Sequence, residues 1–285
     1  MSESITIIHL SDLHFVSELS LFRGLLDHQR LISKRHLGWL NHKLRRQKHF
    51  DASLKERIFD YLHESQWDYL IITGDLGTLT LPREYDSARQ SLDPLNQKGK
   101  ILLTSGNHDR YVKTSPEPGL FSRSFKDYWP YSESVSEDFR HCFYELSDSA
   151  ILVELDMAIP RIFYSSRGRL NEGISAIEKI LKNEYKDHLK IAIGHYPAFL
   201  PPGEREGFLH SLSGRDRLKR FLLDMDFRFY LHGHIHKSWM FNPVTDKQLT
   251  IINSGGCCKY ADGEWSGFHK ITLTGKAADV ERINC

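Results

Sequence analysis

The stretch "FRFYLHGHIH" (residues 227–236) places three histidines within five positions, directly after a largely apolar run. A short apolar run bounded by polar residues is typical of a buried β-strand. A histidine cluster behind such a strand can be a packed edge, a solvated loop or a metal site. The rest of the chain decides among these, because a metal site needs further ligands from other segments.

Four other apolar runs also end in polar or glycine-containing turns. They are "ITIIHL" (5–10), "YLIIT" (69–73), "KILLTS" (100–105) and "KIAIG" (190–194). Helical patterns lie between several of them, at residues 52–65, 174–185 and 214–225. This alternation predicts an α/β architecture. Three strand patterns in the tail, "KSWMF", "QLTIIN" and "GFHKITL", predict a second, more antiparallel sheet near the C-terminus.

The composition predicts a globular protein with one sizeable core. The chain has 285 residues, 40% of them hydrophobic, with no internal repeat or linker, so we expect a single domain over residues 1–285. Its 38 basic and 37 acidic residues leave a net charge of +1, which does not favour nucleic acid as a partner. Four cysteines without a Cys-x-x-Cys spacing, and a first segment unlike a signal peptide, predict a soluble, cytoplasmic protein.

One segment, at about residues 19–50, differs from the rest in charge. Leu, Ile, Phe and Trp are interleaved there with eight basic residues against one acid, Asp27. The basic residues are Arg23, Arg30, Lys34, Arg35, Lys43, Arg45, Arg46 and Lys48. Such a basic amphipathic insertion can lie peripherally on an anionic inner membrane, or cap a site for a phosphorylated ligand with an apolar part. A helical insertion that simply packs its apolar face on the core has the same pattern.

Polar side chains suited to binding metal ions follow each of the five buried runs. They are Asp12 and His14, Asp75, Asn107 with its neighbour His108, His195, and finally His234 and His236. The carboxyl ends of strands in an open α/β sheet face one crevice, so we expect these residues to converge. Mixed carboxylate, imidazole and amide ligands suit Mn, Fe or Zn. A carboxylate such as Asp75 can bridge two divalent ions, which would together activate a water molecule.

In this order the motifs resemble those of the calcineurin-like metallophosphoesterases, whose pattern is D-x-H, GD, GNH-D/E, (G)H and GH-x-H. The matching stretches are Asp12–His14, Gly74–Asp75, Gly106–Asp109, Gly194–His195 and Gly233–His236. The resemblance implies a four-layer α/β/β/α sandwich, in which two mixed sheets are flanked by helices. It also implies hydrolysis of a phosphodiester or pyrophosphate bond through attack by a hydroxide that bridges two metal ions.

The resemblance also assigns a role to each matched residue. One metal ion would be held by Asp12, His14, Asp75 and His236. The second would be held by Asp75, Asn107, His195 and His234. His108 would hydrogen-bond the phosphoryl oxygen or protonate the leaving group, and Asp109 would orient His108.

The resemblance leaves several functions open. Bacterial members related to the class III cyclic-nucleotide phosphodiesterases are most similar, although "GHYP" (194–197) lacks the second histidine that often follows there. The enzymes that cleave UDP-2,3-diacylglucosamine pyrophosphate in lipid A synthesis are also similar, although "GNHD" (106–109) differs from the GNRD of one branch. A phosphorylated small molecule and a lipid-linked nucleotide are thus alternative substrates. A nuclease and a non-catalytic protein-binding scaffold are further alternatives.

Overall fold

The computed structural model of the chain describes residues 4–16, 52–110, 119–129, 139–161, 165–258 and 267–284. The basic segment at 19–50 lies outside the described residues, so the expectations attached to it stay predictions from sequence. Among the helices of the described ranges, none is both long enough and apolar enough to cross a membrane.

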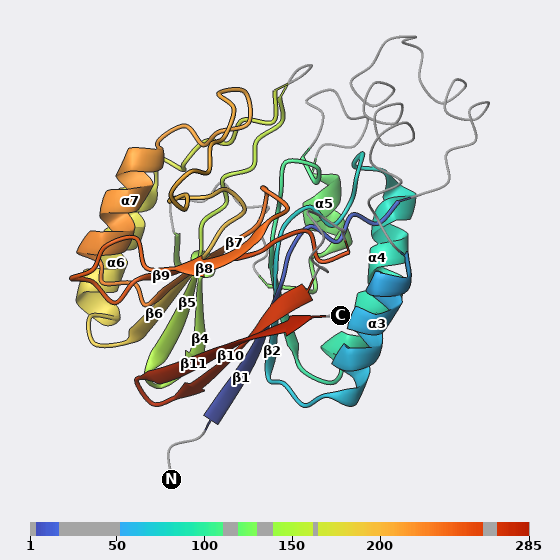
Figure 1. Cartoon of the computed structure of the whole chain (residues 1–285), viewed down its shortest axis with the longest axis horizontal. Coiled ribbons are helices and arrows are strands. Elements are labelled where there is room, and N and C mark those ends of the chain that lie inside the picture. Colours follow the sequence, from blue (N-terminus) through green and yellow to red (C-terminus); the bar gives the residue numbers. More distant parts are fainter. Residues whose placement is uncertain are drawn as a thin grey trace.

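Two β-sheets form the centre of the molecule, and both contain parallel and antiparallel neighbours (Figure 1). The first has the order β11-β10-β1-β2-β3, with β1 Ser4–Leu10, β2 Tyr69–Thr73, β3 Lys100–Thr104, β10 Gly267–Thr274 and β11 Ala277–Asn284. The second has the order β4-β5-β6-β7-β9-β8. Its strands are β4 Phe143–Ser147, β5 Ala150–Glu154, β6 Leu189–Ile193, β7 Phe229–His232, β8 Ser238–Phe241 and β9 Thr250–Ser254.

The expectation that the tail forms a sheet of its own is wrong. Strands β8 and β9 complete the second sheet, where β9 runs parallel to β7. Strands β10 and β11 instead cross to the first sheet, where β10 pairs antiparallel with β1. Each tail segment therefore extends a sheet that earlier strands have begun, because the edges of those sheets offer unpaired backbone groups.

Helices cover the outer face of each sheet and complete the predicted four layers. The first sheet is covered by α3 Ala52–Glu64, α4 Pro82–Asn96 and the short α5 Leu120–Ser124, and the second by α6 Ile174–Glu184 and α7 Arg215–Asp224 (Figure 1). Alternate residues of a strand face opposite sides. In β2, for example, Ile71 points into the layer between the sheets while Ile72 packs under the helices. The α/β/β/α sandwich expected from the sequence is thus confirmed.

A polar tie crosses the layer between the sheets at the carboxyl ends of β3 and β5. The hydroxyl of Thr104 donates a hydrogen bond of 2.5 Å to Glu154 Oε1, and both side chains are buried. Burial and the neighbouring Asp156 carboxylate raise the pKa of Glu154 to about 8, while the bond from Thr104 acts in the opposite direction. The tie lies next to the strand ends that carry the motif residues.

Glu154 should make the stability of the fold depend on pH. Between pH 4.5, where an ordinary glutamate titrates, and about 8, the folded protein keeps a proton that the unfolded chain has released. The contribution of Glu154 to the free energy of unfolding therefore falls as pH rises through this window. Urea unfolding from pH 5 to 8 should show a smaller decline for Glu154→Gln than for the wild type. Glu145→Gln, an exposed change on β4, should keep the wild-type slope, and equal slopes in all three proteins would contradict the assignment.

Candidate metal centre

The expected ligands occupy tight turns that directly follow the parallel strands of both sheets. The described non-glycine residues with positive φ include five of them: Asp12 (54°), His14 (44°), Asp75 (54°), His234 (77°) and His236 (57°). Only Thr80 and Asp226 share this backbone conformation within the described ranges. Left-handed backbone is costly for residues with a side chain and concentrates at functional sites. The strain therefore marks the same turns as the motifs.

The first group consists of Asp12, His14, Asp75 and His236, each of which offers a ligand atom within 4.8 Å of the others. The Nε2 atoms of His14 and His236 lie 3.2 Å apart, and His236 Nε2 lies 3.2 Å from Asp12 Oδ1. Asp12 Oδ2 accepts hydrogen bonds from the Ser11 hydroxyl and the His234 amide. Its buried Oδ1 has no hydrogen-bond partner among the residues that the structure describes. An orphaned carboxylate oxygen facing two imidazole nitrogens fits a bound cation.

The second group shares Asp75 with the first. Asp75 Oδ2 lies 3.9 Å from His14 Nε2 in the first group and 3.4 Å from His195 Nε2 in the second. The Asn107 amide oxygen is 3.1 Å from His195 Nε2 and 2.8 Å from His234 Nδ1. The structure thus brings all seven expected ligands together, with one carboxylate oxygen between the two groups.

The electrostatics of the site favour cations. Burial alone would raise the pKa of Asp75, but the imidazoles of His195, His108 and His14 hold it well below its usual range. Burial opposes protonation of His195, yet the Asp75 carboxylate outweighs it and raises the pKa of His195 to about 9. Burial lowers the pKa of His234 to about 3, so this ring is neutral and can donate a lone pair to a metal ion.

The structure separates the roles expected for His108 and Asp109. His108 Nδ1 lies 2.7 Å from the carbonyl oxygen of Thr78, a contact that helps to orient the ring. The Asp109 carboxylate accepts hydrogen bonds from three backbone amides, of Leu76 (3.3 Å), Gly77 (2.9 Å) and Gly106 (2.9 Å). Asp109 therefore joins the turns after β2 and β3, and its expected role beside His108 stays a prediction.

Two motif glycines allow the turns to approach one another. A Cβ atom at Gly106 would overlap the backbone and carboxylate of Asp75, and one at Gly233 would overlap Ser11 and Asp12. Close contact with a ligand-bearing turn explains why each position lacks a side chain.

The sequence patterns did not identify two residues in the loop before α7 that contact His234. Glu206 Oε1 lies 3.1 Å from His234 Nε2, and the His210 carbonyl oxygen lies 3.0 Å from the same nitrogen. No local motif marks either residue. Their proximity to His234 depends on the path of the loop, which only the folded chain reveals.

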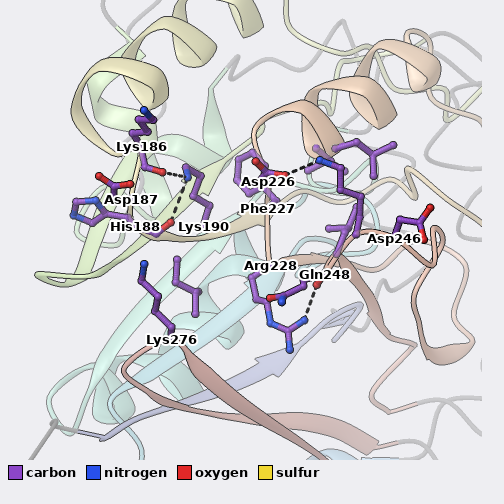
Figure 2. A pocket seen from close by; sticks show the side chains of 15 residues that line it. Lys186, Asp187, His188, Lys190, Asp226, Phe227, Arg228, Asp246, Gln248 and Lys276 are labelled. Carbon is purple, nitrogen blue, oxygen red and sulfur yellow. Dashed lines mark hydrogen bonds and ion pairs between the residues drawn. The ribbon is translucent and has the colours of Figure 1, made fainter.

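A cavity of about 470 Å³ lies at the opposite ends of the strands, where β6 and β7 begin (Figure 2). None of the expected site residues lines it. Its Lys190 ammonium donates to two backbone carbonyls, Arg228 donates to a third, and Lys247 pairs with Asp226 at 2.8 Å. The side chains of Lys190, Arg228 and Lys247 are thus already engaged by groups of the chain, and the motif turns remain the site where chemistry is expected.

Solved structures with the same fold include two phosphatases. A dimetal phosphatase from Danio rerio has a TM-score of 0.58 at 13% identity, over 98% of this chain and 96% of that one. A purple acid phosphatase from yellow lupin (Lupinus luteus) seeds has a TM-score of 0.59 at 14% identity, over 100% of this chain. The chain spans about half of the lupin enzyme, 52% of its length. GAP50, the anchor in the inner membrane complex of Plasmodium, has a TM-score of 0.51 at 10% identity, over 99% of this chain and 84% of that one.

The sandwich and the paired ligand groups define a metal-dependent phosphoesterase. The sequence model of the calcineurin-like phosphoesterases matches residues 5–238, and the chain belongs to this family. It is accordingly a hydrolase that acts on phosphoester bonds. A comparison with curated protein sequences gave no match.

Replacing Asp109 should reveal its structural role. In Asp109→Asn the amide group would place N–H donors against backbone N–H donors, and we expect the free energy of unfolding to fall by about 1–3 kcal/mol. Urea unfolding measures the loss, with Asp127→Asn, whose carboxylate is 56% exposed, as the matched control. Unchanged stability together with a shifted pH profile of hydrolysis would instead restore Asp109 as the partner of His108.

Proposed function

We propose that the chain is a dinuclear phosphohydrolase that cleaves a phosphodiester or pyrophosphate bond. The observation that carries this proposal is the position of Asp75 Oδ2 between the two ligand groups, 3.9 Å from His14 Nε2 and 3.4 Å from His195 Nε2. A carboxylate oxygen shared in this way suits a bridging ligand of two nearby ions.

Each ion would have four protein ligands. Asp12, His14, Asp75 and His236 would hold one ion. Asp75, Asn107, His195 and His234 would hold the other. Because nitrogen and oxygen donors are mixed, we propose Mn, Fe or Zn rather than Mg. When bound, two such ions supply Lewis acidity and lower the pKa of a bound water molecule.

His108 is the proposed catalytic side chain beside the ions. Its ring centroid lies 5.0 Å from that of His14, so it borders the first ligand group. The Thr78 carbonyl can only accept a hydrogen bond, so His108 Nδ1 carries a proton and the ring is fixed in orientation. We propose that His108 hydrogen-bonds the phosphoryl oxygen or protonates the leaving group.

The proposed substrate is a phosphorylated small molecule or a lipid-linked nucleotide. The support for the lipid-linked class comes from sequence alone, since the basic and apolar residues at 19–50 suit an amphiphilic ligand or peripheral contact with a membrane. The nearly balanced charge of the chain favours neither class over the other but disfavours a nuclease.

Two substitutions should separate metal binding from proton transfer. Asp75→Asn weakens the shared ligand, so we expect loss of both ions and of hydrolysis. His108→Ala should retain both ions and lower turnover by about 10²–10⁴-fold. Elemental analysis and hydrolysis of bis-p-nitrophenyl phosphate measure the two effects. His188→Ala, at the distal cavity, is the matched control and should match the wild type. Full metal content and turnover in Asp75→Asn would rule out the dinuclear assignment.

A panel of substrates, assayed with Mn²⁺ and then with a chelator, distinguishes the alternatives. Chelator-sensitive turnover of UDP-2,3-diacylglucosamine alone would identify a lipid-precursor enzyme, and turnover of cyclic AMP a cyclic-nucleotide phosphodiesterase. We expect bis-p-nitrophenyl phosphate to be cleaved in either case, because the metal centre acts on the phosphoryl group itself. A protein that binds two ions but cleaves nothing in the panel would favour the scaffold alternative.

A further inference from the structure

We propose that Glu206, held by Arg215, is a positioning residue that fixes His234 and strengthens one of the two metal positions. The inference rests on the proposed dinuclear centre and adds to it a residue outside the family motifs.

The two nitrogens of His234 face in different directions. Nδ1 lies 2.8 Å from the Asn107 amide oxygen, within the second ligand group. Nε2 faces away from the centre, toward the His210 carbonyl oxygen at 3.0 Å and Glu206 Oε1 at 3.1 Å. The carbonyl and the carboxylate that face Nε2 accept hydrogen bonds and cannot donate them, so Nε2 carries the hydrogen and Nδ1 keeps the lone pair. This is the tautomer that a ligand at Nδ1 requires.

The carboxylate of Glu206 is buried and is paired with the guanidinium of Arg215. Its side chain is 2% exposed and forms an ion pair with Arg215, the first residue of α7. The Oε1 atom lies against His234 Nε2, and within the described part of the chain it has no other polar partner. A buried carboxylate is costly unless it is paired. With an ion bound at Nδ1, the N–H at Nε2 would be more positive, and the Glu206 carboxylate would then stabilise it.

The loop that carries Glu206 is anchored on the side away from the centre. The Ser166 amide donates to the Leu209 carbonyl at 3.0 Å, and the Ser166 hydroxyl lies 2.6 Å from His210 Nδ1. The Leu170 amide donates to the Ser213 carbonyl at 2.9 Å. These contacts hold the stretch that follows Glu206 and position the His210 carbonyl, which together with Glu206 faces His234.

A purely structural ion pair would give a different result from a positioning residue. Loss of a structural ion pair loosens the whole site and lowers the stability of the fold, so the binding of both ions would be weakened together. Loss of a positioning carboxylate lowers the affinity for the ion that His234 would bind. The affinity for the ion at Asp12, His14 and His236 stays unchanged. The affinities of the two ions, measured separately, tell these roles apart.

The experiment titrates Mn²⁺ into the metal-free full-length protein and follows both binding steps by calorimetry. We expect Glu206→Gln, which keeps the shape of the side chain but removes its charge, to weaken one step by about 10–100-fold and to leave the other at the wild-type value. Glu206→Ala should weaken the same step at least as much. Glu204→Gln is the matched control, because Glu204 lies in the same loop but pairs with the partly exposed ammonium of Lys237.

Each outcome decides between the two proposals. If the wild type shows two binding steps, and Glu206→Gln leaves both unchanged or weakens both equally, the role of Glu206 is overturned. The dinuclear proposal would then still stand. The same selective loss in Glu204→Gln would also overturn it, because the effect would then belong to the charge of the loop. A wild-type protein that binds fewer than two ions would overturn the dinuclear proposal, and the role of Glu206 with it.

Discussion

The candidate centre depends on one carboxylate, Asp75, in the turn that follows strand β2, which lies between β1 and β3. One of its oxygens faces His14 and His195, and the other accepts the His108 amide at 2.7 Å. Asp75 therefore connects both ligand groups and the turn that carries the proposed catalytic histidine. It has little room to move, because its backbone has a φ of 54° and its carboxylate is packed against Gly106.

The fold could be predicted from sequence wherever hydrophobic patterns were strong. The five apolar runs and three helical patterns match β1, β2, β3, β6, β7, α3, α6 and α7 to within about two residues. Helix α4 was missed, because Pro94 lies inside it and its charged residues blur the apolar stripe. The placement of the tail was wrong because pairing between distant strands is set by the edges that the rest of the chain leaves open.

The site was predictable to the extent that its residues follow strands at short, fixed spacing. All seven expected ligands meet, since the direction of a strand determines where the next few residues go. Asp109 and Glu206 could not be assigned in this way. Two of the three amides that Asp109 contacts lie about thirty positions upstream, and Glu206 reaches His234 through a loop without regular pattern. Both cases depend on tertiary packing of loops, which local sequence does not encode.

The ligands come from both sheets, and His14 and His236 are 222 positions apart in the chain. Ions held there would clamp the two halves of the sandwich together at one end, beside the tie between Thr104 and Glu154. A ligand that binds only the folded state shifts the folding equilibrium in proportion to its free concentration. Metal supply would thus govern the lifetime of the protein in the cell as well as its chemistry. In metal-starved cells the chain would open more often and be degraded sooner, which would lower the number of molecules along with the activity of each one.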